Sequence, residues 1–238
     1  PTVVWVTPER VLGGNLGLSL IAPIGWKDVT ADIDARATLT LGPPLSRTIT
    51  ANRSFSFGDE EGAFGDPLVS AFLGWHDGNL HYSLGTLVNI PAGQWDEGQI
   101  SNIGFNHWAF DVTGAVTWLD PKTGLELSGA VGFTFNTENP DTDYKSGTDF
   151  HVEFAAMQNL SKQFAIGVTG YHYKQMTGDS GTGAVLGDFK GQVTAIGPAI
   201  NYNFQIGALP VSTSLKWSHE FNTENRLAGD MGFLTILI

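Results

Sequence analysis

Apolar and polar residues alternate along ten stretches of the chain, and a period of two is typical of β-strands, whose successive side chains point to opposite faces. The stretches are residues 12–24, 29–41, 67–75, 80–90, 108–118, 125–135, 150–156, 164–170, 211–217 and 232–238. The cleanest is 29–41, which has one wholly apolar face: Val29, Ala31, Ile33, Ala35, Ala37, Leu39 and Leu41. No apolar face in the ten stretches carries a charged side chain, so the sequence predicts an all-β protein.

Alternation alone does not separate a soluble sheet protein from a membrane barrel, because the apolar face packs in a core in one and meets lipid in the other. Composition favours the barrel. Charged residues make up 15% of the chain, against about 25% in soluble domains, and the net charge is −12. The polar faces are mostly hydroxyl, amide and glycine, which suits a water-filled lumen better than an outer surface.

Aromatic residues are placed as a membrane predicts. Trp108 and Trp118 share the apolar face and lie ten residues apart, which spans roughly 25 Å of membrane at about 3.3 Å per residue and a tilt near 40°. Trp75 and Trp217 also lie near strand ends, where amphipathic rings meet lipid headgroups. We expect these four tryptophans at the membrane interface; the alternative is that they are ordinary core aromatics.

The connections alternate in length. Short turns at 77–78, 120–124, 159–162 and 207–209 alternate with longer polar loops near 58–65, 92–104, 137–148, 176–187 and 222–230. Outer-membrane barrels place short turns in the periplasm and long loops outside, so the last strand, 231–238, is predicted to run toward the periplasm. No run of eighteen apolar residues is present that would predict a transmembrane helix.

We therefore predict a transmembrane antiparallel up-and-down β-barrel of outer-membrane type, formed by one domain over residues 1–238. Even strand numbers are the rule for such barrels, and we predict twelve. The first strands leave alternatives open: residues 1–10 form a first strand or an N-terminal segment, and 45–57 form an independent strand or part of a loop. The chain begins at Pro1 without a methionine or a signal peptide, so we expect a mature or trimmed form.

The residues opposite the apolar faces are the candidate lumen lining. They are Asp28, Thr30, Asp32, Asp34, Arg36, Asp111, Glu126, Asp149, His151, Glu153, Lys216 and Glu220. Eight of them are acids and two are bases, so an acidic lumen would favour cations or neutral solutes over anions. In the alternative, these charges pair across strands and only solvate the interior.

Other chemistry has little support. The chain has no cysteine, and its acidic balance argues against nucleic-acid binding. Asp149, His151 and Glu153 share one strand face and could form an acid/base group, but no G-x-S-x-G motif or metal-ligand spacing accompanies them. We expect no catalytic residue, metal or cofactor.

Several short motifs, in a fixed order, resemble a known family. They are Gly65-Asp66-Pro67, Pro91-Ala92-Gly93, Asn102, Asn106-His107-Trp108, Asn136 to Asn139, Tyr144 to Gly147, Gln175, Gly178-Asp179, Gly197-Pro198 and Asn225-Arg226. Together they resemble the outer-membrane channels named for the meta-pathway of phenol degradation. The resemblance implies passive uptake of small hydrophobic or aromatic molecules and assigns no catalytic residue.

The resulting hypothesis is a monomeric channel of the bacterial outer membrane, in contact with lipid and lipopolysaccharide. Gly197-Pro198 interrupts a strand-like run and could mark a bulge that opens a lateral exit, or a local irregularity without functional meaning. Two other classes stay open: a membrane-embedded hydrolase with its site at the extracellular rim, and a plugged structural barrel.

Overall fold

The structure is a computed structural model that describes residues 1–41 and 47–238. Within these ranges the chain forms thirteen strands. They are β1 (Thr2–Val11), β2 (Gly14–Ile21), β3 (Ile24–Leu41), β4 (Arg47–Phe64), β5 (Leu68–Asp77), β6 (Leu80–Asn89), β7 (Ala109–Leu119), β8 (Leu125–Asn136), β9 (Asp149–Asn159), β10 (Phe164–Gln175), β11 (Gln192–Ile206), β12 (Leu209–Glu224) and β13 (Asp230–Leu237). None of the described residues forms a helix long and apolar enough to cross a membrane.

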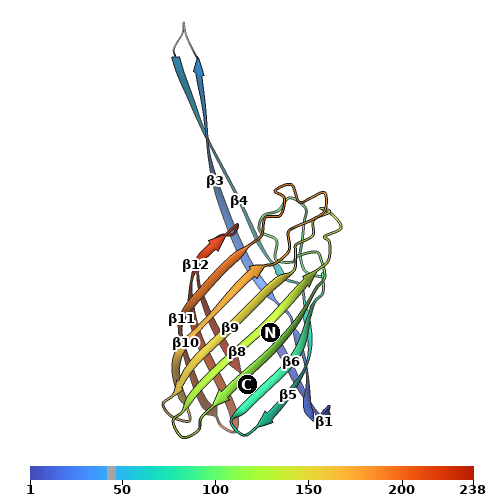
Figure 1. Cartoon of the computed structure of the whole chain (residues 1–238), viewed down its shortest axis with the longest axis vertical. Coiled ribbons are helices and arrows are strands. Elements are labelled where there is room, and N and C mark those ends of the chain that lie inside the picture. The colour runs from blue at the N-terminus through green and yellow to red at the C-terminus, as the bar shows by residue number, and fades with distance from the viewer. Residues whose placement is uncertain (42–46) are drawn as a thin grey trace.

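Eleven strands form one antiparallel sheet in the order β1-β2-β5-β6-β7-β8-β9-β10-β11-β12-β13. Figure 1 shows this sheet curving round into a barrel, of which β1 and β13 are the two sheet edges. The strands β3 and β4 pair only with each other among the described residues, as a hairpin that extends beyond one end of the barrel. The predicted up-and-down barrel fold is therefore confirmed, with thirteen described strands against the twelve predicted.

The strand register keeps the two faces continuous around the wall. Directly opposed residues in an antiparallel pair lie on the same face. One outward row is Trp75, Tyr82, Val116, Gly129, Phe154 and Gly170. One inward row is Ser83, Ala115, Ala130, Glu153, Tyr171, Ala195 and Glu220. The alternation read from the sequence therefore becomes an apolar exterior and a mostly polar interior.

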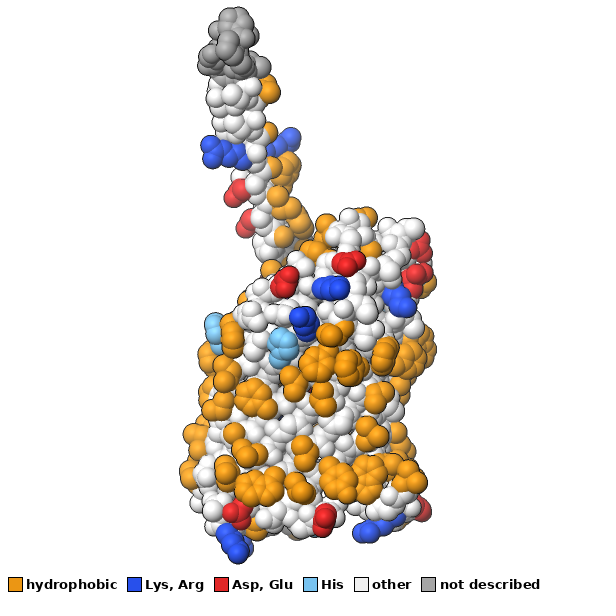
Figure 2. Space-filling model, in the orientation of Figure 1, with side chains coloured by type: hydrophobic (Ala, Val, Ile, Leu, Met, Phe, Trp, Pro, Cys, Tyr) orange, Lys and Arg blue, Asp and Glu red, His pale blue; other side chains and the backbone are white. Residues whose placement is uncertain are grey.

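The exterior exposes large apolar side chains that a soluble protein would bury. Trp108 is 42% exposed, Val116 47% and Phe133 42%. The one cluster of buried apolar side chains in the described residues is small and centres on Met157, Ala165 and Ala199. Figure 2 shows hydrophobic side chains spread over the barrel's flank, with charged side chains gathered near its two ends and on the hairpin. This distribution is that of a wall facing lipid.

Short turns close one end of the barrel and long loops lie at the other (Figure 1). Gly78 and Gly207 lie in two-residue turns at φ of 58° and 61°, a left-handed conformation that glycine adopts without strain. The long loops 137–148 and 176–191 gather at the end from which the hairpin extends. β13 runs from the loop end to the turn end, which is the predicted direction of the last strand.

The region before β5 decides two open alternatives and differs from the prediction at one loop. Residues 2–11 form a strand, one of the two alternatives, and β4 makes 47–57 an independent strand; positions 45–46 lie outside the described residues. The loop predicted near 58–65 is wrong, because β4 continues to Phe64. Its charges at Asp59, Glu60 and Glu61 pair in register with β3 on an exposed hairpin, where water solvates them.

Candidate functional site: the barrel lumen

Cavities of about 500, 370 and 370 Å³ lie inside the barrel. The largest is lined from β7 to β10 on one side and from β12 and β13 on another. A second lies among β8 to β13, and the third among β1, β2 and β5 to β7. Because their lining comes mostly from inward positions of strands far apart in the sheet, these cavities are parts of the lumen.

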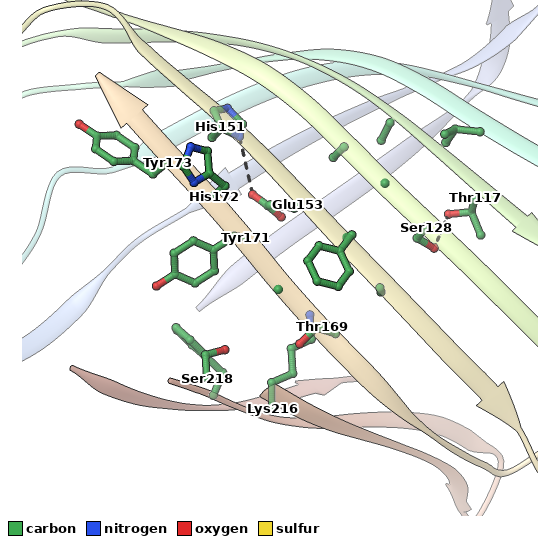
Figure 3. Close-up of a pocket in the computed structure, with 18 of the residues that line it drawn as sticks. Thr117, Ser128, His151, Glu153, Thr169, Tyr171, His172, Tyr173, Lys216 and Ser218 are labelled. Atoms are coloured by element: carbon green, nitrogen blue, oxygen red, sulfur yellow. Dashed lines mark hydrogen bonds and ion pairs between the residues drawn. The ribbon is translucent and has the colours of Figure 1, made fainter. Parts of the chain in front are cut away.

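A hydrogen-bonded group centres on Asp111 of β7. Thr113 Oγ1 and Thr134 Oγ1 donate to its carboxylate at 2.5 and 2.7 Å. His151 Nε2 of β9 lies 2.8 Å from Asp111 Oδ2, and His151 Nδ1 lies 3.8 Å from Glu153 Oε1 (Figure 3). The imidazole therefore lies between two carboxylates on the lumen wall.

Glycine at position 132 lets this group form. β8 lies between β7 and β9, and Gly132 pairs with Thr113 on one side and with His151 on the other. A Cβ atom at Gly132 would lie 2.2 Å from Thr113 Oγ1 and 2.5 Å from His151 Nε2. Without a side chain there, His151 reaches across a whole strand to Asp111.

Asp149, also on β9, is held by the next strands. Tyr173 Oη donates to Asp149 Oδ1 at 2.7 Å, and Asn136 Nδ2 donates to Asp149 Oδ2 at 3.0 Å. The guanidinium of Arg226 lies over the Tyr173 ring, 5.3 Å from its centroid. Asp149 is thus a bonded wall residue near the loop end.

Glu220 of β12 is the most enclosed of these acids, with its side chain 6% exposed. Tyr171 Oη donates to it at 2.7 Å and the Gly229 amide at 3.0 Å, and Arg226 Nη2 lies 3.6 Å from it. Arg226 belongs to one of the sequence motifs, but the alternation did not assign it to the lumen, because it follows the last residue of β12.

Two charged side chains of the lumen, Glu153 and Lys216, have fewer polar partners than Asp111, Asp149 and Glu220. The Glu153 side chain is 64% exposed and contacts only His151, at 3.8 Å, among the described residues. Lys216 of β12 lines the cavity of about 500 Å³ and the cavity of about 370 Å³ among β8 to β13, and the described residues give it no hydrogen bond or ion pair. Both line the cavity drawn in Figure 3. Near the turn end, Glu126 accepts a long hydrogen bond of 3.4 Å from Asn159.

The predicted lumen residues divide into two sets. The structure brings seven of them to the barrel wall: Asp111, Glu126, Asp149, His151, Glu153, Lys216 and Glu220. It places the other five on β3, outside the eleven-stranded sheet: Asp28, Thr30, Asp32, Asp34 and Arg36. The reason is that β2 pairs directly with β5, so the wall is continuous without β3.

One side of the lumen carries large apolar side chains among its polar ones, which the sequence did not predict. Phe72 of β5, Phe233 and Leu237 of β13 and Val6 of β1 line the cavities from inward positions. The Phe72 ring covers Gly17, where a Cβ atom would lie 2.2 Å from it. The signal was the irregular alternation in 67–75 and 232–238, where both faces contain apolar residues.

Asp66 fixes the loop between β6 and β7, and this explains two of the motifs. The buried Asp66 carboxylate accepts hydrogen bonds from the Gly93 amide at 2.9 Å, the Phe105 amide at 2.8 Å and Asn89 Nδ2 at 2.9 Å. A Cβ atom at Gly93 would lie 2.4 Å from the Gly65 backbone. Gly65-Asp66-Pro67 and Pro91-Ala92-Gly93 therefore meet in space.

The two other long loops are joined above the barrel. Tyr144 Oη donates to Asp179, which also accepts from Gln175 Nε2 at 2.6 Å. Burial, with the hydrogen bond to Asp179, raises the pKa of Tyr144 to about 12, so this phenol stays a donor to a higher pH than an ordinary tyrosine. Backbone hydrogen bonds of 2.9 and 3.0 Å join Lys145 to Ser180. These contacts fix the loops to each other at the mouth.

The four predicted interface tryptophans all lie on outward positions. Trp75 stacks on Tyr82 with ring centroids 5.5 Å apart, and its Nε1 donates to the Leu12 carbonyl at 3.1 Å. Trp108 is 42% exposed, Trp118 36% and Trp217 46%.

Comparison with known proteins agrees with this architecture. No protein with a curated description matches the chain. The crystal structure of an outer membrane channel from Pseudomonas putida F1 is similar in fold, with a TM-score of 0.65 at 12% identity over 94% of this chain and 82% of that one. A family model described as the putative MetA-pathway of phenol degradation matches residues 1–236. The chain therefore belongs to this phenol-degradation family.

Proposed function

We propose that the protein is a channel of the bacterial outer membrane through which small hydrophobic or aromatic molecules diffuse passively. The observation that carries this is the wall, whose strands combine an exposed apolar face, free of charge between the strand ends, with cavities on the opposite face. The family and the fold of the Pseudomonas putida channel support the same conclusion. The protein works as a monomer in contact with lipid and lipopolysaccharide, as one domain in which the β3–β4 hairpin extends from the barrel, with Trp75, Trp108, Trp118 and Trp217 at the headgroups.

The two-sided lumen suits a particular kind of permeant. Phe72, Phe233 and Leu237 offer apolar contacts on one side, and the hydroxyls and carboxylates of β7 to β12 offer hydrogen bonds on the other. A molecule with an aromatic ring and one polar substituent satisfies both sides at once. Such a molecule, moving along the barrel axis, keeps its ring against the apolar side chains and its polar substituent hydrogen-bonded to the other side.

The charges of the lining favour cationic or neutral permeants. The acids Asp111, Glu126, Asp149, Glu153 and Glu220 share the lumen with one lysine, Lys216. The bonds to Asp111, Asp149 and Glu220 partly support the alternative that these charges only solvate the wall. Glu153 is the exception, since it is exposed and weakly paired, and we assign it the largest share of the selectivity.

The geometry around His151 gives little support to a hydrolase. In a nucleophile–base pair the hydroxyl bonds to the imidazole, which a carboxylate orients from its other side. Here Thr113 Oγ1 donates to Asp111 at 2.5 Å and lies 3.4 Å from His151 Nε2, the same nitrogen that contacts Asp111. This is the pattern of a hydrogen-bonded wall.

The lateral exit at Gly197-Pro198 is less well supported than axial passage. The β11–β12 ladder has no paired residues at these two positions. The backbones are nevertheless close, because a Cβ atom at Gly197 would lie 1.8 Å from the Trp217 carbonyl oxygen. The register is the same on both sides of these positions, at Ile196–His219 and Ala199–Lys216, so no bulge lies here, and we propose the axial route.

A flux measurement with matched aromatic ions tests the proposal. Swelling of proteoliposomes would be followed in benzyltrimethylammonium chloride and in sodium benzenesulfonate, whose organic ions cross lipid slowly. We expect faster swelling with the cation, and a smaller difference for Glu153→Gln. Swelling no faster than in protein-free vesicles with either solute would overturn the channel. Faster entry of the sulfonate would overturn the acidic selectivity alone.

A further inference from the structure

Two histidines face each other inside the turn end of the barrel. β5 and β6 are joined by the two-residue turn Gly78-Asn79, and His76 is the direct partner of His81, one pair above the closing pair Asp77 and Leu80. Their Nδ1 atoms lie 3.2 Å apart and their ring centroids 4.6 Å apart. Opposed side chains on a short hairpin have little freedom to separate.

This spacing is that of two ligands on one metal ion. Zn–N bonds of about 2.0–2.1 Å that meet at a tetrahedral angle place their nitrogens about 3.3 Å apart. Imidazole is a preferred ligand of zinc, copper and nickel. We propose that His76 and His81 bind a divalent transition-metal ion through their Nδ1 atoms. The ion replaces the proton that joins the two nitrogens in the metal-free pair.

The surroundings leave room for such an ion. Both histidines line the cavity of about 370 Å³ among β1, β2 and β5 to β7, with Asn15, Ser83 and Thr117 as polar neighbours. No group of three or more His, Cys, Asp or Glu side chains converges anywhere in the described ranges, so water completes the coordination. On the outer face, the stack of Trp75 on Tyr82 holds the same two strands in register.

The other histidines lack this arrangement. Of the six in the chain, only His76 and His81 have a second imidazole as hydrogen-bond partner. The remaining four contact oxygen atoms: His107 the Phe105 carbonyl, His151 Asp111, His172 Thr194 and His219 Asp230. His172 therefore offers a matched control, since its substitution removes one imidazole and leaves the pair intact.

Calorimetric titration of Zn²⁺ into the full chain, without a histidine tag and in detergent micelles, tests the site. We expect one equivalent to bind, with at least tenfold weaker affinity in His76→Gln and in His81→Gln and unchanged affinity in His172→Gln. Far-UV circular dichroism checks that each variant keeps its strands. No saturable binding to the unaltered protein, or equal affinity in the double variant His76→Gln/His81→Gln, would overturn the proposal.

A spectroscopic readout identifies the ligands independently of affinity. Electron paramagnetic resonance of one equivalent of Cu²⁺ resolves the coupling to each directly bound nitrogen. Two imidazole nitrogens are expected in the unaltered protein and in His172→Gln, and one in either single variant. A two-nitrogen spectrum that persists in the double variant would place the copper elsewhere and overturn the assignment.

Discussion

The strands β3 and β7 both alternate apolar and polar residues, but they lie in different places in the fold. Val29 to Leu41 is the most regular apolar stripe in the chain, yet β3 pairs only with β4 and extends beyond the barrel (Figure 1). β7 has a less uniform stripe and pairs on both edges, with β6 and β8. Alternation therefore sets which face of a strand is apolar, whereas the strand available at its edge decides where the strand lies.

The local reason is the pairing of β2 with β5. β2 precedes the hairpin in the sequence and β5 follows it, and these two strands pair with each other from Asn15–Gly74 to Ile21–Leu68. Their facing edges are therefore already occupied. The hairpin then keeps its apolar face exposed, as at Ile33, which is 51% exposed, and Phe55, 46%.

The base of the hairpin is tied to the loop between β6 and β7. Asp59 accepts from Ser101 Oγ at 2.9 Å, and Lys27 Nζ donates to the Asn102 carbonyl at 3.2 Å. The Ser101 hydrogen bond lowers the pKa of Asp59, so the carboxylate stays ionised at more acidic pH than an ordinary aspartate.

The largest expected effect is at Asp66, where the chain returns from the hairpin to the wall. Asp66→Ala removes the acceptor of three hydrogen bonds in a buried position, and unsatisfied buried donors cost about 1–3 kcal/mol each. We expect the free energy of unfolding in lipid vesicles to fall by about 3–5 kcal/mol. The exposed Asp77→Ala is the control, with a change within about 0.5 kcal/mol. An Asp66 variant as stable as the control would show that the loop does not need this carboxylate.

Next in size is a charge on the apolar face of each of these two strands. Val112→Lys places a cation on the apolar face of β7 between the positions of Trp108 and Trp118, where lipid contact costs about 2–4 kcal/mol. Ile33→Lys makes the same kind of change on β3, and with water around it we expect less than about 0.5 kcal/mol. Unfolding in urea with vesicles measures both. An equal loss of unfolding free energy in the two variants would contradict the placement of β7 in lipid and β3 in water.

A smaller effect is expected from removing one acid in each region. Glu153→Gln should weaken the cation preference, read as the reversal potential of single channels under a salt gradient, because Glu153 is an exposed lumen acid. Asp34→Asn, on the hairpin, should leave the reversal potential unchanged. A shift with Asp34→Asn and none with Glu153→Gln would mean that the hairpin acids line the path of the ions.

The smallest effect should follow excision of the hairpin. A variant in which an Asn-Gly turn replaces residues 30–58 retains the Val29–Asp59 pair at the base and the hydrogen bond from Ser101 to Asp59. Because isolated two-stranded ribbons are marginally stable, we expect the barrel to lose less than about 1 kcal/mol of unfolding free energy. Failure of this variant to fold would show that the hairpin takes part in forming the wall.

The faces of the wall strands were predictable, and their partners were not. Val112, Val116 and Phe133 could be assigned outward from a period of two alone, and Gly78 indicated its turn. The direct β2–β5 pairing could not be predicted. The strands β3 and β4, of 18 residues each, could lie inside the barrel wall or outside it without any change in the sequence pattern.

The contacts of the site were only partly predictable. The sequence brought Asp149, His151 and Glu153 to one face, but the bond from His151 to Asp111 crosses an intervening strand and depends on Gly132. The inward position of Phe72 was missed because its stretch is apolar on both faces. A linear pattern does not record which strands become neighbours.

The most direct test is a scan with single introduced cysteines, which the chain permits because it has none of its own. Spin labels along 109–119 and 29–39, in lipid vesicles, report accessibility to oxygen in lipid and to a nickel chelate in water. The account predicts a period of two in β7, with oxygen contact at Phe110, Val112 and Val116 and chelate contact at Asp111 and Thr113. On β3, both faces should contact the chelate. Uniform water exposure along β7, or a lipid-facing period of two along β3, would contradict it.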